Sequence, residues 1–166
     1  MLIILNDSKQ LTRVGCMTTS ETDAHGLAES IRRAGLRVTG PRLAVLSVLE
    51  HESHINAEKI YRAVLPTLPG TSVQAVHGVL AAFTEAGLLR RIEPAHSPAL
   101  YERRIGDNHH HVVCSGCGAV EDVDCIVGHS PCLTPFSSTG FSIQTAEVTF
   151  WGLCPACQAS ASTELV

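Results

Sequence analysis

The sequence HHHVVCSGCG occupies positions 109–118 and places three imidazoles and two thiols within nine residues. Such a density of nitrogen and sulfur donors is typical of metal binding. In its Cys-x-x-Cys unit, Cys114 and Cys117 can aim both sulfurs at one ion. A second pair near the end of the chain, Cys154 and Cys157, completes the four thiolates of a closed tetrahedral site. The sequence therefore predicts one structural zinc ion per subunit.

Paired cysteines have two other common uses, redox chemistry and disulfide bonding. A redox-active dithiol usually begins at a helix N-terminus, whereas Cys114 follows an apolar run and precedes glycines. Disulfides are typical of exported proteins. The only early apolar run, residues 2–5, is shorter than a signal-peptide core or a membrane span. We therefore expect a cytoplasmic protein without a membrane segment, and we keep a zinc-containing thiol redox protein as the alternative from another class.

Charge is distributed unevenly along the 166 residues, which carry a net charge of −4. Residues 24–105 contain ten Lys or Arg against seven Asp or Glu, whereas residues 106–166 contain six acids and no Lys or Arg. This asymmetry indicates two modules, a mildly basic one for a polyanion and an acidic one for cations.

The basic module, residues 24–105, shows four helical patterns followed by two extended pieces at 88–92 and 100–104. Helices are expected to begin near Leu27, at the Thr39-Gly40-Pro41 stretch, at a capping Asn56 and at a capping Ser72. Helices followed by a two-stranded ribbon are typical of a winged helix-turn-helix, in which residues 72–86 would enter the DNA major groove. The same pattern also fits a small helical interaction domain.

The acidic module, residues 106–157, contains short β-prone runs at 112–113, 119–123 and 146–153. Alternation in the last run predicts a strand with both faces partly covered. Each cysteine pair lies at the end of a run, so zinc would join the C-terminal strand to the strand after the histidines. Residues 1–23 and 158–166 are polar and are expected to be flexible.

These motifs resemble the ferric uptake regulator (Fur) family of metal-dependent transcriptional regulators. The matching pieces lie at 36–39, 72–80, 87–88, 101–102, 109–118 and 152–157, and they are most similar to the actinobacterial, peroxide-responsive FurA and CatR branch. The resemblance implies an α+β homodimer, with N-terminal winged helices on a double-stranded operator and a small C-terminal α/β dimerisation domain that holds zinc. It implies a repressor and not an enzyme.

The resemblance also implies a second, regulatory metal site. Three imidazoles and two carboxylates suit Fe²⁺ or Mn²⁺ better than a thiolate cage does. Ligands drawn from both modules would couple metal occupancy to DNA affinity. The residues implied are His54, Glu102, His109, His111 and Asp122.

Within the family, aspartate at the position of Asp122 resembles the peroxide sensors, and glutamate resembles the iron-responsive regulators. Peroxide would act through oxidation of a ligand histidine, by analogy His54 or His109. We therefore expect control of oxidative-stress genes of the catalase type, with iron-responsive control of iron uptake as the alternative, since Glu121 is adjacent.

The DNA contacts implied are Arg37 toward the minor groove or backbone, and Ser72, Gln74 and His77 toward bases. His77 stands where the family usually has tyrosine, and Gly78 where a basic residue is common. We expect these departures to weaken or alter operator affinity. Four side chains receive no firm role: Cys16, Cys125, His129 and Cys132.

Overall fold

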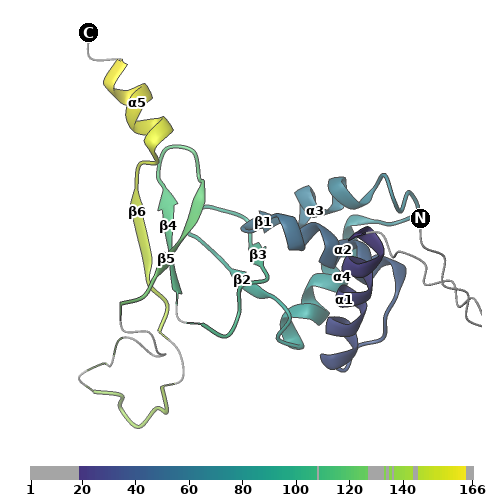
Figure 1. Ribbon diagram of the computed structural model, residues 1–166. Helices are drawn as coiled ribbons and strands as arrows, with labels where there is room; N and C mark the ends of the chain where they lie inside the picture. The colour runs from purple at the N-terminus through teal and green to yellow at the C-terminus, as the bar shows by residue number, and fades with distance from the viewer. Residues whose placement is uncertain are drawn as a thin grey trace, which may run out of the picture.

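The computed structural model describes residues 19–107, 109–126, 133, 135, 137–143 and 146–163. Helices α1 to α4 gather on one side of a small sheet, and a second sheet lies on its other side (Figure 1). The helices are α1 (Thr19–Arg33), α2 (Gly40–His51), α3 (Ala57–Val64), α4 (Val73–Glu85) and α5 (Pro155–Thr163). The strands are β1 (Ile55–Asn56), β2 (Arg90–Ile92), β3 (Leu100–Glu102), β4 (His109–Cys114), β5 (Val120–Asp124) and β6 (Thr149–Gly152).

The main apolar core lies among α1 to α4. Apolar side chains at helical spacing meet there and are withdrawn from water, with Ile31, Leu46, Ile60, Leu80 and Phe83 each 0% exposed. Complete burial of such a side chain contributes roughly 1.5–3 kcal/mol. This core therefore gives the helical part a rigid framework on which the small sheet is carried.

The predicted helix starts at two capping residues are confirmed. The Asn56 side chain accepts a hydrogen bond from the Lys59 backbone N–H at 2.9 Å. The Ser72 hydroxyl accepts one from the Ala75 N–H at 3.1 Å. Each bond satisfies a backbone donor that the first helical turn leaves without a partner.

The small sheet has the strand order β1-β3-β2, where the sequence predicted only a two-stranded ribbon. Strand β1 was missed because two residues are too short for a periodic pattern. Its antiparallel register pairs Ile55 with Tyr101 and Asn56 with Leu100. Extending this register by one residue brings His54 toward Glu102, so the missed strand sets the position of an expected metal ligand.

The second sheet has the order β5-β4-β6, with β4 antiparallel to β5 and parallel to β6. The parallel register pairs Cys114 at the end of β4 with Gly152 at the end of β6. The expectation that the cysteine pairs would meet where these two strands end is therefore correct. Helix α5 follows β6 and extends away from the sheet (Figure 1).

Strand β6 corrects one prediction. Both of its faces are exposed in the single chain, including Phe150 at 47% and Trp151 at 49%. The alternation in its sequence correctly indicated apolar faces. However, β6 is an edge strand, and the described part of this chain leaves about half of Phe150 and of Trp151 exposed.

The chain ends correct two further expectations. Helix α1 starts at Thr19, inside the segment 1–23 expected to be flexible, and α5 continues through residues 158–163 of the expected flexible tail. Polar composition was taken to indicate loose chain, yet first turns of helices are commonly polar. Alanine is the strongest helix former and proline suits a first turn, which accounts for α5 from Pro155 onward.

Candidate metal centres

Four cysteine sulfurs converge at the end of the second sheet. Cys114 ends β4, Cys117 lies in the turn after it, and Cys154 and Cys157 flank the start of α5. Their sulfurs all lie within 4.8 Å of one another. The approach is close enough that a Cβ added at Gly116 would lie 3.0 Å from the Cys157 Sγ. This clustering fits the donor set of a tetrahedral thiolate site.

The electrostatics of the cluster also favour a bound cation. Backbone hydrogen bonds from Cys154 and Cys117 lower the pKa of Cys114 to about 6. The Cys154 N–H donates to the Cys114 Sγ at 3.2 Å. In contrast, hydrogen bonding to the Cys154 and Cys114 sulfurs raises the pKa of Cys157 to about 12. The Cys114 thiol thus loses its proton readily, whereas the Cys157 thiol keeps its proton. A bound cation would stabilise the thiolate form of all four cysteines.

Four of the five residues expected as regulatory ligands come together at the junction of the two sheets: His54, Glu102, His111 and Asp122 each offer a ligand atom within 4.8 Å of the others. His109 lies beside this group without being part of it, with its Nε2 3.1 Å from Glu102 Oε1. His54 immediately precedes β1 and Glu102 ends β3, so these two come from the small sheet and the residue next to it. His109 and His111 lie on β4 and Asp122 lies on β5, in the second sheet. His54 has a positive φ of 54°, a strained conformation for a residue other than glycine, of the kind found at functional sites.

Distances within this cluster are short, and its centre is buried. His54 Nε2 lies 2.9 Å from Asp122 Oδ1 and 3.0 Å from Glu102 Oε2. His111 Nε2 lies 3.4 Å from Glu102 Oε1, and His109 Nε2 lies 3.1 Å from the same oxygen. Glu102 is 0% exposed.

Four buried atoms of this cluster lack a hydrogen bond of good geometry: His54 Nε2, Glu102 Oε2, His111 Nε2 and Asp122 Oδ1. They lie close together, yet their lone pairs and protons are not aligned with one another. A buried polar atom without a partner costs about 1–3 kcal/mol. A divalent cation held among these atoms would satisfy all four at once, so the residues present fit such an ion.

The pKa values in this cluster show how strongly the charges are coupled. Burial alone would lower the pKa of His54, but the carboxylates of Glu102 and Asp122 lie 3.0 and 2.9 Å from its Nε2 and raise it above 6.5. Burial would raise the pKa of Glu102, but the close approach of the His111 and His54 imidazoles brings it well below the ordinary value. Without a metal, the two carboxylates therefore favour the protonated form of His54.

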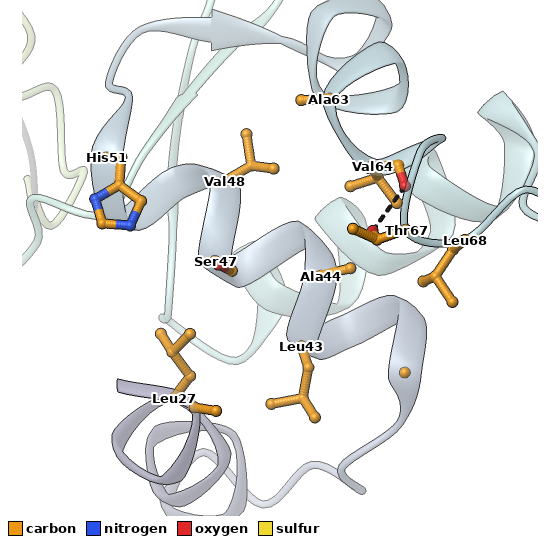
Figure 2. A pocket seen from close by; sticks show the side chains of 12 residues that line it. Leu27, Leu43, Ala44, Ser47, Val48, His51, Ala63, Val64, Thr67 and Leu68 are labelled. Carbon is orange, nitrogen blue, oxygen red and sulfur yellow. Dashed lines mark hydrogen bonds between the residues drawn. The ribbon is translucent and has the colours of Figure 1, made fainter. Parts of the chain in front are cut away.

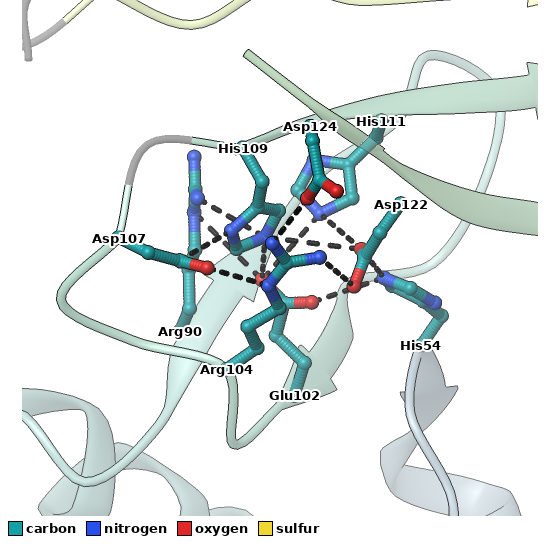
Figure 3. A network of polar contacts seen from close by, with 9 residues as sticks. All are labelled: His54, Arg90, Glu102, Arg104, Asp107, His109, His111, Asp122 and Asp124. Atoms are coloured by element: carbon teal, nitrogen blue, oxygen red, sulfur yellow. Dashed lines mark hydrogen bonds and ion pairs between the residues drawn. The ribbon is translucent and has the colours of Figure 1, made fainter. Parts of the chain in front are cut away.

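An outer layer of charged residues surrounds the ligand set, and sequence reasoning missed all of it (Figure 3). Arg104 bonds Asp107, Asp122 and Asp124, with its Nη1 3.1 Å from Asp122 Oδ2. Arg90 Nη1 lies 3.3 Å from His109 Nε2. The available signal was strand alternation, which places Asp124 on the same face of β5 as Asp122.

Comparison with known proteins assigns the chain. The model of the ferric uptake regulator family matches residues 33–150. The chain belongs to the ferric uptake regulator family. It is accordingly a metal-dependent transcriptional regulator of the Fur type.

Its relatives agree with this assignment. The transcriptional regulator FurA of Mycobacterium tuberculosis is 53% identical over 133 residues, covering 80% of this chain and 90% of the relative. The Fur structure from Vibrio cholerae superposes with a TM-score of 0.59 at 25% identity, covering 76% of this chain and 98% of that one. The Fur structure from Helicobacter pylori gives 0.61 at 21% identity, covering 85% and 95%, and shows the shared fold.

The residues implied as DNA contacts are all exposed in this Fur-family chain. Arg37 lies between α1 and α2, and its carbonyl accepts a hydrogen bond from Arg42 Nη1 at 2.7 Å. Ser72 caps α4, so its hydroxyl already has a backbone partner. Gln74 and His77 line a hollow of about 610 Å³ beside α4.

Other side chains singled out from the sequence fall outside both metal centres. His110 lies between the two ligand histidines of β4 and points to the other face of the sheet. It is 7% exposed and packs edge-on against Phe150, with ring centroids 6.3 Å apart. Cys125, which received no firm role from the sequence, is half-buried. Cys16, His129 and Cys132 lie outside the described residues.

An apolar hollow of about 550 Å³ lies between α1, α2 and α3 (Figure 2). It is lined by Leu27 of α1, Leu43 of α2 and Val64 of α3, and by Leu68 after α3. His51 is its one metal-binding type of side chain, so it does not resemble the two metal centres. Among the described residues, no helix is long and apolar enough to span a bilayer.

Proposed function

We propose that this Fur-family regulator is a cytoplasmic, homodimeric repressor whose DNA binding requires Fe²⁺ or Mn²⁺ at the His54 cluster, and which senses peroxide there. Its targets would be oxidative-stress genes of the catalase type. The observation that carries the proposal is the set of four unpartnered buried atoms contributed by both sheets. A cation bound to them would fix how the small sheet and the second sheet are oriented.

The ligands we assign to this regulatory ion are His54, Glu102, His109, His111 and Asp122. Three neutral imidazoles and two carboxylates carry a charge of −2 in total, which a divalent cation neutralises. Nitrogen and oxygen donors without sulfur suit Fe²⁺ and Mn²⁺. The described residues therefore support a second metal chemically distinct from the one in the thiol cluster.

We assign structural zinc to Cys114, Cys117, Cys154 and Cys157. Their convergence within 4.8 Å supports a closed four-sulfur site. The H. pylori relative is described as having three functional metal binding sites. The two clusters here would account for two sites in this chain.

We further propose that residues 24–105 form a winged helix-turn-helix domain and residues 106–157 a dimerisation domain. Exposure of Gln74 and His77 on α4 supports a role for this helix in the major groove, and Arg37 would contact the minor groove or backbone. Ser72 would serve mainly as the helix cap. Exposure of Phe150 and Trp151 supports pairing of two copies through the second sheet.

Peroxide sensing rests on the identity of Asp122. Its Oδ1 faces the ligand set, whereas the neighbouring Glu121 is exposed and pairs with Val112 in the ladder. Oxidation of His54 or His109 would remove a nitrogen donor and release the two sheets from each other. The alternative is iron-responsive control of iron uptake, and the names of the relatives fit it equally well.

The deciding experiment measures operator binding by electrophoretic shift at fixed salt. The protein is loaded with Fe²⁺ or with Mn²⁺ and then treated with hydrogen peroxide. A peroxide sensor loses DNA binding when loaded with iron and keeps it when loaded with manganese. If both forms keep their affinity, and only the metal concentration matters, the iron-responsive alternative is correct.

The thiol redox alternative makes a different prediction. It requires turnover of a disulfide substrate that disappears in Cys114→Ser. A repressor with structural zinc shows no such turnover, and the same substitution removes its zinc and its folded C-terminal domain.

A further inference from the structure

We propose that Arg104 and Asp107 are positioning residues for the regulatory ion. They hold Asp122 and His109 so that one oxygen and one nitrogen face the metal. This inference rests on the proposed function, in which the His54 cluster binds a divalent cation. Both residues lie in the segment 103–107, which follows β3 of the small sheet and leads toward β4 of the second sheet.

The first part of the inference concerns the two oxygens of Asp122. Arg104 Nη1 donates to Asp122 Oδ2 at 3.1 Å. The other oxygen, Oδ1, points into the cluster and lies 2.9 Å from His54 Nε2. Because the guanidinium engages Oδ2, Oδ1 is the oxygen that Asp122 would present to an ion in the cluster.

The second part concerns the two nitrogens of His109. Asp107 Oδ1 lies 2.7 Å from His109 Nδ1. An ionised carboxylate can only accept, so the Nδ1 proton is fixed on that side. On the other side of the ring, Arg90 Nη1 lies 3.3 Å from Nε2, and because a guanidinium can only donate, it favours a lone pair on that nitrogen. Nε2 faces the cluster, 3.1 Å from Glu102 Oε1. A carboxylate that orients a ligand histidine in this way commonly sets the affinity of a metal site.

The two positioning residues also hold each other. Arg104 Nε donates to Asp107 Oδ2 at 2.6 Å, so the carboxylate that orients His109 is itself oriented by the guanidinium that orients Asp122. Arg104 Nη2 also donates to Asp124 Oδ1 at 2.5 Å. The connecting segment is thus bonded to two ligands of the second sheet, and its conformation and the geometry of the site depend on each other.

Positive and negative charges balance both among the ligands and in the layer of residues around them. The ligand carboxylates Glu102 and Asp122 match one divalent cation. Outside them, the cations Arg90 and Arg104 match the anions Asp107 and Asp124. The four outer residues together carry no net charge, so the layer as a whole adds no net repulsion toward the metal. Removal of either member of the Arg104 and Asp107 pair therefore disturbs both geometry and charge.

The test uses full-length protein with zinc in the thiol cluster and Mn²⁺ as the probe, with free Mn²⁺ measured by electron paramagnetic resonance. We expect Asp107→Ala and Arg104→Gln to raise the Kd for Mn²⁺ by roughly 10- to 100-fold. Asp107→Asn keeps an acceptor for the His109 proton and should lose less. Arg91→Gln removes an arginine that is paired with Glu93 on the same sheet, away from the ligands. It should keep the wild-type Kd.

A second readout does not depend on the metal. In the Mn²⁺-free protein, ¹⁵N NMR of the imidazoles should show His109 with its proton on Nδ1, and Asp107→Ala should change that signal. Side chains of both residues are partly exposed, and zinc content and helical circular dichroism check that each variant folds.

The outcomes separate the two proposals. Wild-type Mn²⁺ affinity and an unchanged His109 signal in correctly folded Asp107→Ala and Arg104→Gln would overturn the positioning role while leaving the regulatory site intact. A wild-type protein that binds neither Mn²⁺ nor Fe²⁺ outside the thiol cluster would overturn the proposed function, and this inference with it.

Discussion

His111 of β4 stands directly opposite Asp122 of β5 in the antiparallel ladder, and its Nε2 lies 3.6 Å from Asp122 Oδ1. Opposite residues of two strands point to the same face of a sheet. Strand register therefore decides which acidic residue reaches the cluster. A shift by one residue would turn Asp122 away and bring Glu121 to that face. The choice between aspartate and glutamate, on which the sensing proposal depends, is thus made by backbone pairing.

The close approach at Gly116 predicts a contrast between two glycine substitutions. Gly116→Ala places a Cβ 3.0 Å from Cys157 Sγ, so that the sulfur must shift and zinc should be retained less tightly. Gly78→Ala lies in α4 with open space around it and should stabilise the protein by about 0.5–1 kcal/mol. Zinc release to a chelator and urea unfolding of both variants check this. Equal zinc release from the two would contradict the packing argument.

The raised pKa of His54 predicts how metal affinity varies with pH. In the metal-free protein the proton on His54 stabilises the fold below the ordinary pKa of 6.5, and this contribution is lost as the pH rises through the raised value. A cation must displace the proton, so Mn²⁺ affinity should increase with pH, by about tenfold per unit below the raised pKa.

Titrations of Mn²⁺ between about pH 6 and about pH 8 measure this slope. The variant His54→Gln has no proton to displace at that position and should show a weaker affinity with a flatter pH dependence. Affinity that decreases as the pH rises would show that the coupling has the opposite sign.

Exposure of Arg37 predicts a loss of DNA binding when its charge is removed. Arg37→Ala should reduce operator affinity about tenfold, because a charge-assisted contact contributes about 1.5 kcal/mol. Arg62 offers a matched control, since it is an exposed arginine of α3 already paired with Glu58. Arg62→Ala should leave affinity within about twofold. Electrophoretic shifts at one salt concentration compare them, and unchanged binding by Arg37→Ala would remove that residue from the interface.

The uncovered strand β6 predicts an interface between two copies. Trp151→Glu introduces a charge on this strand and should shift sedimentation from dimer toward monomer. Phe141→Ser provides the comparison, because Phe141 is 73% exposed but lies outside β6. It should leave the dimer intact. A Trp151→Glu protein that sediments as a dimer would place the interface elsewhere.

The helix starts and the cysteine cluster could be predicted from the sequence because they depend on local chemistry. Asn56 and Ser72 mark helix starts because their side chains satisfy backbone donors, and a capping residue acts over only three positions. The cysteine spacing likewise gave a cluster that the structure brings together. Such signals depend on neighbours along the chain.

The features that were missed depend on residues distant in sequence. Strand β1 exists because Ile55 pairs with Tyr101, and the sequence around neither residue indicates this pairing. Arg104 reaches Asp122 across 18 positions. The exposure of β6 was mispredicted for a related reason. Alternating apolar residues indicate that a face of a strand is apolar, but they do not indicate whether the same chain or a second copy covers that face.

The parallel pairing of β4 with β6 also constrains how the protein is made. Cys114 and Cys154 are 40 positions apart, and the second thiol pair lies beyond every other element except α5. During synthesis, all the ligands of the second ion emerge from the ribosome before the thiol cage can close. A nascent or prematurely terminated chain that stops short of Cys154 presents only two sulfurs, so it cannot capture zinc in the mature geometry.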